Sequence, residues 1–257
     1  PTLGIREVLG IILVVAMVLY AAAQLTAGSK ALNVFFGWDY SAGAILGSLI
    51  VILYCFAGGI RASIWTDVIQ FCIMFIAMGV LLFVAMAHIG SFEKLTLSLK
   101  EIDPELVSFW PDYKKFGAVP FILGWFALGL SLIGFPHVMS RLKCVRTPKD
   151  ARTATYWYYA TYSAFYVTAY MVAVTTRVLL PEGLSFDPEL ALPQMAMEYL
   201  PSIMVGLILA GIFASTISTT DSLVLAATAT ISRDFVPSRK DSYGFLKAST
   251  MSVTLVA

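Results

Sequence analysis

The chain consists of long apolar blocks separated by short polar segments. Six blocks approach or exceed the roughly 20 residues that a helix needs to cross a bilayer, and a seventh begins near Phe245. The six blocks cover about residues 9–27, 42–57, 64–88, 119–139, 155–180 and 203–231. Backbone amides and carbonyls must find partners inside the bilayer, so these spans are predicted to be α-helices. The pattern predicts an all-α polytopic membrane protein with a single transmembrane domain over residues 1–257.

The composition also favours a membrane protein. Hydrophobic residues make up 59% of the chain and charged residues 13%, against about 45–50% and about 25% in soluble domains. A net charge of +1 without a basic stripe gives no sign of a nucleic-acid partner. Cys55, Cys72 and Cys144 are too scattered for a disulfide framework or a metal site. The two histidines, His88 and His137, are also far apart, so we do not expect an enzyme.

Lysine and arginine are distributed unevenly between alternate loops. One set of loops carries eleven of them, and the other set carries six together with most of the acidic residues. Because Lys and Arg collect on the cytoplasmic side, the first set is predicted to be cytoplasmic. The start of the chain is then inside, and the segments 28–41, 89–117 and 181–201 are outside. We expect a multi-pass protein of the plasma (inner) membrane, with the lipid bilayer as its surroundings.

Two places along the chain predict an interruption between helices. Gly58, Gly59 and Arg61 predict a tight cytoplasmic corner between the second and third spans. Residues 199–232 as a single helix would extend about 50 Å, which exceeds a bilayer core of about 30 Å. A short separate helix is therefore predicted, with a break near Pro201.

The fourth span carries Gly124, Gly129, Gly134 and Pro136. Glycine and proline in a spanning helix mark kinks or unwound stretches, where transporters place binding sites. The alternative is a bent helix that packs tightly against its neighbours. The sequence leaves both interpretations open.

The fifth span carries tyrosines at four-residue intervals, at positions 158, 162, 166 and 170. This spacing places them on one slowly turning stripe of a helix. Packing between helices is the favoured interpretation, and the lining of a polar pathway is the alternative.

The polar run STISTTDS lies inside the sixth apolar block. Ser215, Ser218, Thr219 and Ser222 follow i, i+3, i+4 and i+7 spacing and share one helix face, with Asp221 beside it. Small hydroxyl residues allow close helix packing, and the serines and threonines alone favour that interpretation. Asp221 changes the balance, because an intramembrane carboxylate is expected to be functional. Oxygen ligands suit hard cations, so the run is a candidate cation site with Asp221 on the ion pathway.

A second carboxylate, Asp67, opens the third span within GGIRASIWTDVIQF. An acid at this position is stabilised by the dipole of the helix that it begins. It could equally take part in the passage of an ion. The residues themselves leave both roles open.

Three motifs in order resemble the sodium:solute symporter family: GGIRASIWTDVIQF, GFPHVMSR and ISTTDSLVLAATATISRDF. The resemblance implies a leucine-transporter-like fold of two inverted five-helix repeats. The chain would then hold core helices three to eight and the beginning of nine. We accordingly expect an internal piece of a longer transporter.

The resemblance also implies a sodium site between core helices one and eight. Ser218 and Thr219 would supply hydroxyl ligands, and Ser215 a backbone carbonyl. Asp67 matches the acid that the family places along the intracellular sodium route. Sodium would be the coupling ion, and no further cofactor is expected.

The implied function is sodium-coupled symport of a small organic solute, an amino acid or a monocarboxylate, by alternating access. Proline carriers have Trp, Tyr and Pro at four-residue steps on core helix six. Counting back from Pro136, the aromatic places hold Leu132 and Leu128, and Trp125 is three residues out of step. These four residues are the candidates for solute contact, and the departure puts proline in doubt. The alternative function is a symporter-like sensor domain of a larger signalling protein.

Overall fold

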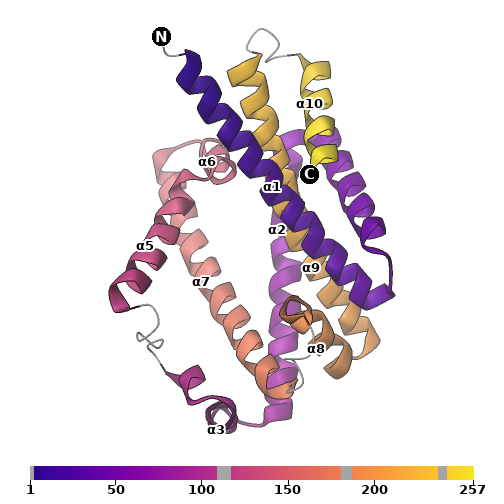
Figure 1. Ribbon diagram of the computed structural model, residues 1–257, viewed down its shortest axis with the longest axis vertical. Coiled ribbons are helices and arrows are strands. Elements are labelled where there is room, and N and C mark those ends of the chain that lie inside the picture. Colours follow the sequence, from indigo (N-terminus) through magenta and orange to yellow (C-terminus); the bar gives the residue numbers. More distant parts are fainter. Residues whose placement is uncertain (1–2, 109–116, 181–186, 237–241) are drawn as a thin grey trace. The chain divides into compact units, whose positions relative to one another are not determined.

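A computed structural model describes residues 3–108, 117–180, 187–236 and 242–257, without the side chains of residues 3, 54, 57–59, 131–133 and 188 (Figure 1). These residues form helices and connecting turns, with no strand among them. The chain divides into two compact units. Unit 1 comprises Pro1–Phe75 with Gly206–Ala257, and unit 2 comprises Ile76–Val205.

The helices are, in chain order, α1 (Leu3–Phe36), α2 (Tyr40–Ile89), α3 (Phe92–Ile102), η1 (Pro104–Val107), α5 (Ala118–Gly134), α6 (Pro136–Leu142), α7 (Pro148–Leu179), η3 (Pro188–Leu190), α8 (Ala191–Tyr199), α9 (Ser202–Thr230), the π-helical turn η4 (Ile231–Phe235) and α10 (Tyr243–Val256). Of the described residues, three stretches are long and apolar enough to cross a membrane: Gly4–Phe36, Ile60–Ile89 and Ser202–Phe235. The all-α class is confirmed. The inverted repeat, the single domain and the count of six full spans stay predictions.

The predicted corner at Gly58 and Gly59 is not a loop. Helical backbone continues from Tyr40 to Ile89 as one helix of 50 residues, so Arg61 lies on a helix. A straight helix of that length would measure about 75 Å. Within unit 1, Figure 1 instead shows the first arm of α2, residues 40–57, and the following stretch up to Phe75 running in different directions. Paired glycines are a usual cause of such a bend, so the sequence marked the change of direction but not its helical form.

The predicted outside segment 28–41 is mostly helical. α1 continues to Phe36, since no proline interrupts residues 28–36, and it ends before Gly37, which has a φ of +66°. The turn ends at Asp39, whose Oδ1 accepts hydrogen bonds from the backbone N of Ser41 at 2.9 Å and from its Oγ at 2.6 Å. This local bonding starts α2.

The predicted outside segment 89–117 also contains a helix, α3, in unit 2. The Ser91 hydroxyl accepts a hydrogen bond from the backbone N of Lys94 at 3.2 Å, which is an N-cap. Leu95 and Leu99 are four residues apart, lie on one face and are buried beside residues of α7. The amphipathic spacing was present in the sequence, but the charged residues around it favoured a loop.

The predicted break near Pro201 is confirmed, and the structure also has a break at Pro136, where the sequence left a bent helix as the alternative. Both breaks lie in unit 2. α5 ends at Gly134, Phe135 has an extended backbone with a ψ of 118°, and Pro136 begins α6. Proline suits a first helical position because its φ is fixed and it has no N–H to satisfy. α8 is the predicted short helix, and it ends before Leu200, whose ψ is 146°. Pro201 then precedes α9.

The core of unit 1 is formed by α1, the first arm of α2, α9 and α10. Its buried apolar residues are Met17, Ala21, Val51, Ile217, Leu223, Val224, Ala226, Ala227 and Val253. Small residues bring the backbones close, as at Gly43, where an added Cβ would lie 2.7 Å from the Cα of Ser29. Such close approach is typical of helix packing in membranes.

Candidate functional site

The polar run of α9 lies in the buried part of unit 1. Asp221 is only 2% exposed, and Thr220 and Ser222 are also buried. Ser218 and Thr219, one turn earlier, are half-buried. A carboxylate out of contact with water needs hydrogen-bond donors, so its partners define the site.

Two serine–carboxylate hydrogen bonds join α2 and α9. The serine donor belongs to α2 in one bond and to α9 in the other. Ser63 Oγ of α2 donates to Asp221 Oδ1 of α9 at 3.2 Å. Ser218 Oγ of α9 donates to Asp67 Oδ1 of α2 at 2.5 Å. Ser63 precedes Asp67, whereas Asp221 follows Ser218, so the two helices run antiparallel here. Each helix therefore contributes one hydroxyl and one carboxylate, and we call these four residues the Ser–Asp cluster.

Helical spacing explains why the cluster forms. Ser63 and Asp67 are four residues apart, and Ser218 and Asp221 are three apart. The two members of each pair therefore lie on the same face of their helix. Ser222 Oγ also lies 3.0 Å from Asp221 Oδ1 and shares its one proton between this oxygen and the Ser218 carbonyl. The buried carboxylate is thus held by hydroxyl donors from both helices, and the cluster gathers several oxygens within unit 1.

The predicted sodium ligands Ser215, Ser218 and Thr219 lie on α9 beside the Ser–Asp cluster. Thr219 Oγ1 donates to the carbonyl oxygen of Ser215 at 3.1 Å, so the two oxygens are neighbours. The Ser218 hydroxyl meets Asp67, and the Ser218 carbonyl accepts from Ser222 Oγ at 2.6 Å. The residue types are those that suit a hard cation, and the assignment to sodium stays a prediction.

The candidate solute residues lie in unit 2. Trp125 and Leu128 of α5 are 56% and 62% exposed, and Pro136 is half-buried at the start of α6. The side chain of Leu132 lies outside the described residues. The role of these residues in binding a solute also stays a prediction.

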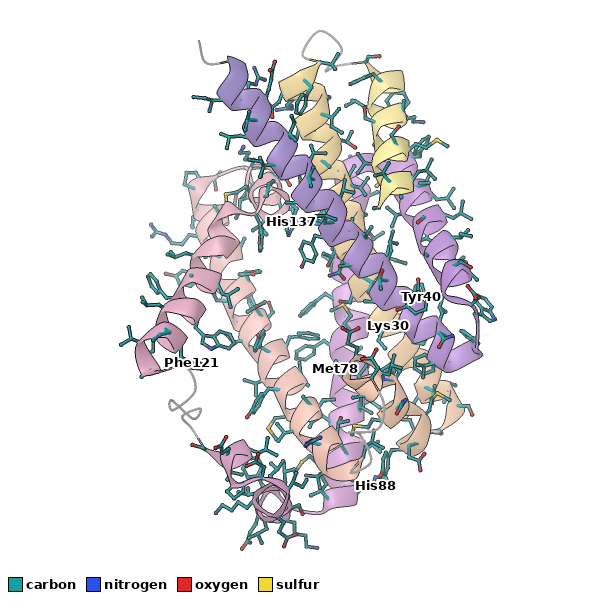
Figure 2. All side chains as sticks on the ribbon, viewed as in Figure 1. Lys30, Tyr40, Met78, His88, Phe121 and His137 are labelled. Carbon is teal, nitrogen blue, oxygen red and sulfur yellow. The ribbon has the colours of Figure 1, made fainter. Side chains whose placement is uncertain are left out.

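The glycines of α5 are not in tight contacts. A Cβ built on Gly124, Gly129 or Gly134 would have no described atom within 4 Å beyond its own stretch of helix. Figure 2 shows Phe121 and His137 near opposite ends of the segment formed by α5 and α6. Of the two sequence interpretations, the broken helix is therefore supported and the tightly packed one is not.

Sequence reasoning missed Ser63. It stands one turn before Asp67 in the same motif, so the i, i+4 spacing was a usable signal. The predicted corner at Gly58 and Gly59 placed Ser63 near a loop, and i, i+4 spacing indicates a shared face only within a helix. Gln70 follows on the same side of α2 and buries its Oε1, which has no hydrogen-bond partner in the described part of the chain.

Comparisons with known proteins show what the chain is similar to. The sequence profile of the Sodium:solute symporter family matches residues 5–243. The high-affinity proline transporter PutP of Bacillus subtilis (strain 168) is 25% identical over 238 residues, which cover 89% of this chain and 48% of the relative. The osmoregulated proline transporter OpuE of the same strain is 25% identical, with 90% and 46% covered. The sodium/proline symporter of Staphylococcus aureus is 28% identical, with 98% and 50% covered.

The chain spans about half the length of the curated relatives it matches. These relatives are named as transporters, which gives the sensor alternative no support. The matched family is one of transporters rather than enzymes. With helices long and apolar enough to cross a membrane, the chain is part of an integral membrane protein. It belongs to the sodium:solute symporter family.

Proposed function

We propose that the intact protein couples sodium entry to the uptake of a small organic solute by alternating access. It would act in the plasma membrane with the start of this chain in the cytoplasm. Family membership supports coupled transport, and the loop charges support the orientation. Coupling of this kind is a reciprocal free energy, in which each ligand raises the affinity for the other.

The observation that carries the proposal is the hydrogen bond between Ser218 and Asp67. Ser218 is a predicted sodium ligand, and Asp67 is the predicted acid of the sodium route. The two residues are 151 positions apart in the chain and lie on different helices. The Ser218 hydroxyl donates its proton to Asp67, so the lone pairs of its oxygen remain for a cation. Sodium would bind at Ser215, Ser218 and Thr219 and leave past Asp67.

The solute would be an amino acid or a monocarboxylate. The relatives are named for proline, which makes proline the first compound to test. Leu128 and Leu132 stand where proline carriers have aromatic residues, so a different side chain or a plain carboxylate is the competing expectation. Trp125 and Pro136 would complete the contact surface.

The test is uptake by the intact protein in proteoliposomes, with labelled proline, pantothenate, acetate, pyruvate and glucose, with and without an inward sodium gradient. Ser218→Ala and Thr219→Ala should each raise the half-saturating sodium concentration by about 10–100-fold, because bonds to charged partners contribute about 1.5–3 kcal/mol. Thr155→Ala is the matched control, since its Oγ1 donates to the Ala151 carbonyl at 2.8 Å but is exposed. Unchanged sodium dependence in both α9 variants would refute the site.

A further inference from the structure

A basic segment of unit 2 connects α6 to α7 (Figure 1). We define the basic collar as the five cations of residues 141–152, namely Arg141, Lys143, Arg146, Lys149 and Arg152. Asp150 is the only acid among these twelve residues. Every member except the half-buried Arg141 is exposed. The segment therefore presents a concentrated positive charge at one end of unit 2.

The acid inside the collar does not neutralise it. Asp150 belongs to the N-cap of α7: its Oδ2 accepts from Thr147 Oγ1 at 2.7 Å, and its backbone N donates to the same oxygen at 3.1 Å. Lys143, Arg146, Lys149 and Arg152 make no ion pair within the part of the chain that the structure describes. Their charge is thus available to an outside anion.

Exposed aromatic side chains follow directly on α7. Tyr156, Trp157 and Tyr159 are 69%, 68% and 62% exposed. They begin one turn after Arg152, on the side of the collar that continues into the fifth predicted span. Amphipathic rings of this kind settle at the boundary between headgroups and acyl chains. They place the collar at headgroup depth.

We propose that the basic collar binds the phosphate groups of anionic phospholipids in the bilayer that surrounds the protein. Clusters of four to eight cations next to a spanning helix have this preference. A soluble polyanion would satisfy the charges but would leave the rings of Trp157 and its neighbours in water. The combination of cations and interfacial rings on one continuous segment favours lipid. The proposal does not depend on which solute or ion the protein transports.

The test uses the intact protein in phosphatidylcholine bilayers with a trace of spin-labelled phosphatidylglycerol or spin-labelled phosphatidylcholine. The measured quantity is the fraction of each label that the protein immobilises. Phosphatidylglycerol should be preferred several-fold, and the preference should weaken in 0.5 M salt, where the Debye length falls to about 4 Å. Neutralising Lys143, Arg146 and Lys149 to Gln should reduce this preference to less than about twofold, because three of the five cations of the collar are lost.

The matched control neutralises three other cations of unit 2, Lys94, Lys100 and Arg177, to Gln. It changes the net charge equally but lies on the predicted outside segments and the far end of α7. The control should retain the preference, and circular dichroism should give the same helix content for both triple variants. The proposal is overturned by equal binding of the two labels, by an equal loss in the control, or by displacement with millimolar inorganic phosphate, which would indicate a plain phosphate site.

Discussion

Helices α7 and α9 both carry polar side chains at helical spacing, but the two stripes have opposite surroundings. On α9, Asp221 and its hydroxyl neighbours are buried and bonded to α2. On α7, Tyr158, Tyr162 and Tyr166 are exposed, and successive ring centroids lie 5.5 Å apart, with the first pair stacked and the second tilted. The first stripe joins two helices, whereas the described ring contacts of the second stripe lie along its own helix.

The difference follows from side-chain size. α9 surrounds its polar run with small residues such as Gly211, Ala214 and Ala226, which let neighbouring backbones approach. α7 places a large aromatic ring at every step of its stripe, and these rings are exposed. Periodicity shows that polar groups share a face, whereas the bulk of the residues around them decides whether that face is buried. The favoured interpretation of the tyrosines as packing residues is therefore not supported within the described residues.

The largest expected effect is at Asp221. Asp221→Ala should lower the free energy of unfolding by roughly 2–4 kcal/mol, because Ser63 loses a buried acceptor and the carboxylate leaves a cavity. The measurement is thermal or denaturant unfolding of the intact protein in detergent. A change below about 0.5 kcal/mol would mean that the Ser–Asp cluster does not hold α2 against α9.

A double-mutant cycle tests the pairing itself. Ser63→Ala combined with Asp221→Ala should cost less than the sum of the single changes, with a coupling of about 0.5–3 kcal/mol. Strict additivity would show that the two side chains act independently.

A smaller effect is expected within α7, which is exposed at its beginning and buried near its end. Thr176 is buried, and its Oγ1 donates to the Val172 carbonyl at 2.7 Å and contacts the sulfur of Met195. Thr176→Val should lower the free energy of unfolding by about 1 kcal/mol. The same change at the exposed Thr155 should stay within about 0.5 kcal/mol. Equal losses at the two positions would contradict the burial gradient along the helix.

The features of the fold that could be predicted depend on single residues with strong backbone preferences. Pro201 cannot continue a helix with full hydrogen bonding, so that break was predicted from the sequence, whereas Pro136 indicated either a break or a bend. Gly58 and Gly59 permit a bend without requiring a loop, and the helical backbone there depends on the surrounding packing. Helix α3 was missed because the charged residues around Leu95 and Leu99 favoured a loop, and the burial of these two leucines beside α7 is a tertiary contact.

The candidate site divides in the same way. The composition and spacing of α9 were enough to single out Ser218, Thr219 and Asp221, and the motif at the start of the third span singled out Asp67. The pairing of Ser218 with Asp67 and of Ser63 with Asp221 is a tertiary contact across more than 150 residues. The spacing predicts which residues share a face of each helix. The antiparallel register of α2 and α9, which is a tertiary feature, decides which of these residues pair.

The smallest expected effect on the free energy of unfolding is at Tyr162, in the tyrosine stripe of α7. Tyr162→Phe keeps the aromatic ring. It therefore keeps the ring contacts with Tyr158 and with Tyr166, each at a centroid distance of 5.5 Å. The side chain of Tyr162 is exposed, so the lost hydroxyl strands no buried partner, and the free energy of unfolding should change by less than about 0.5 kcal/mol. Sodium-driven uptake should likewise keep its half-saturating solute concentration. A rise of tenfold or more in that concentration, with unfolding unchanged, would assign the tyrosine stripe to the polar pathway that its spacing also allowed.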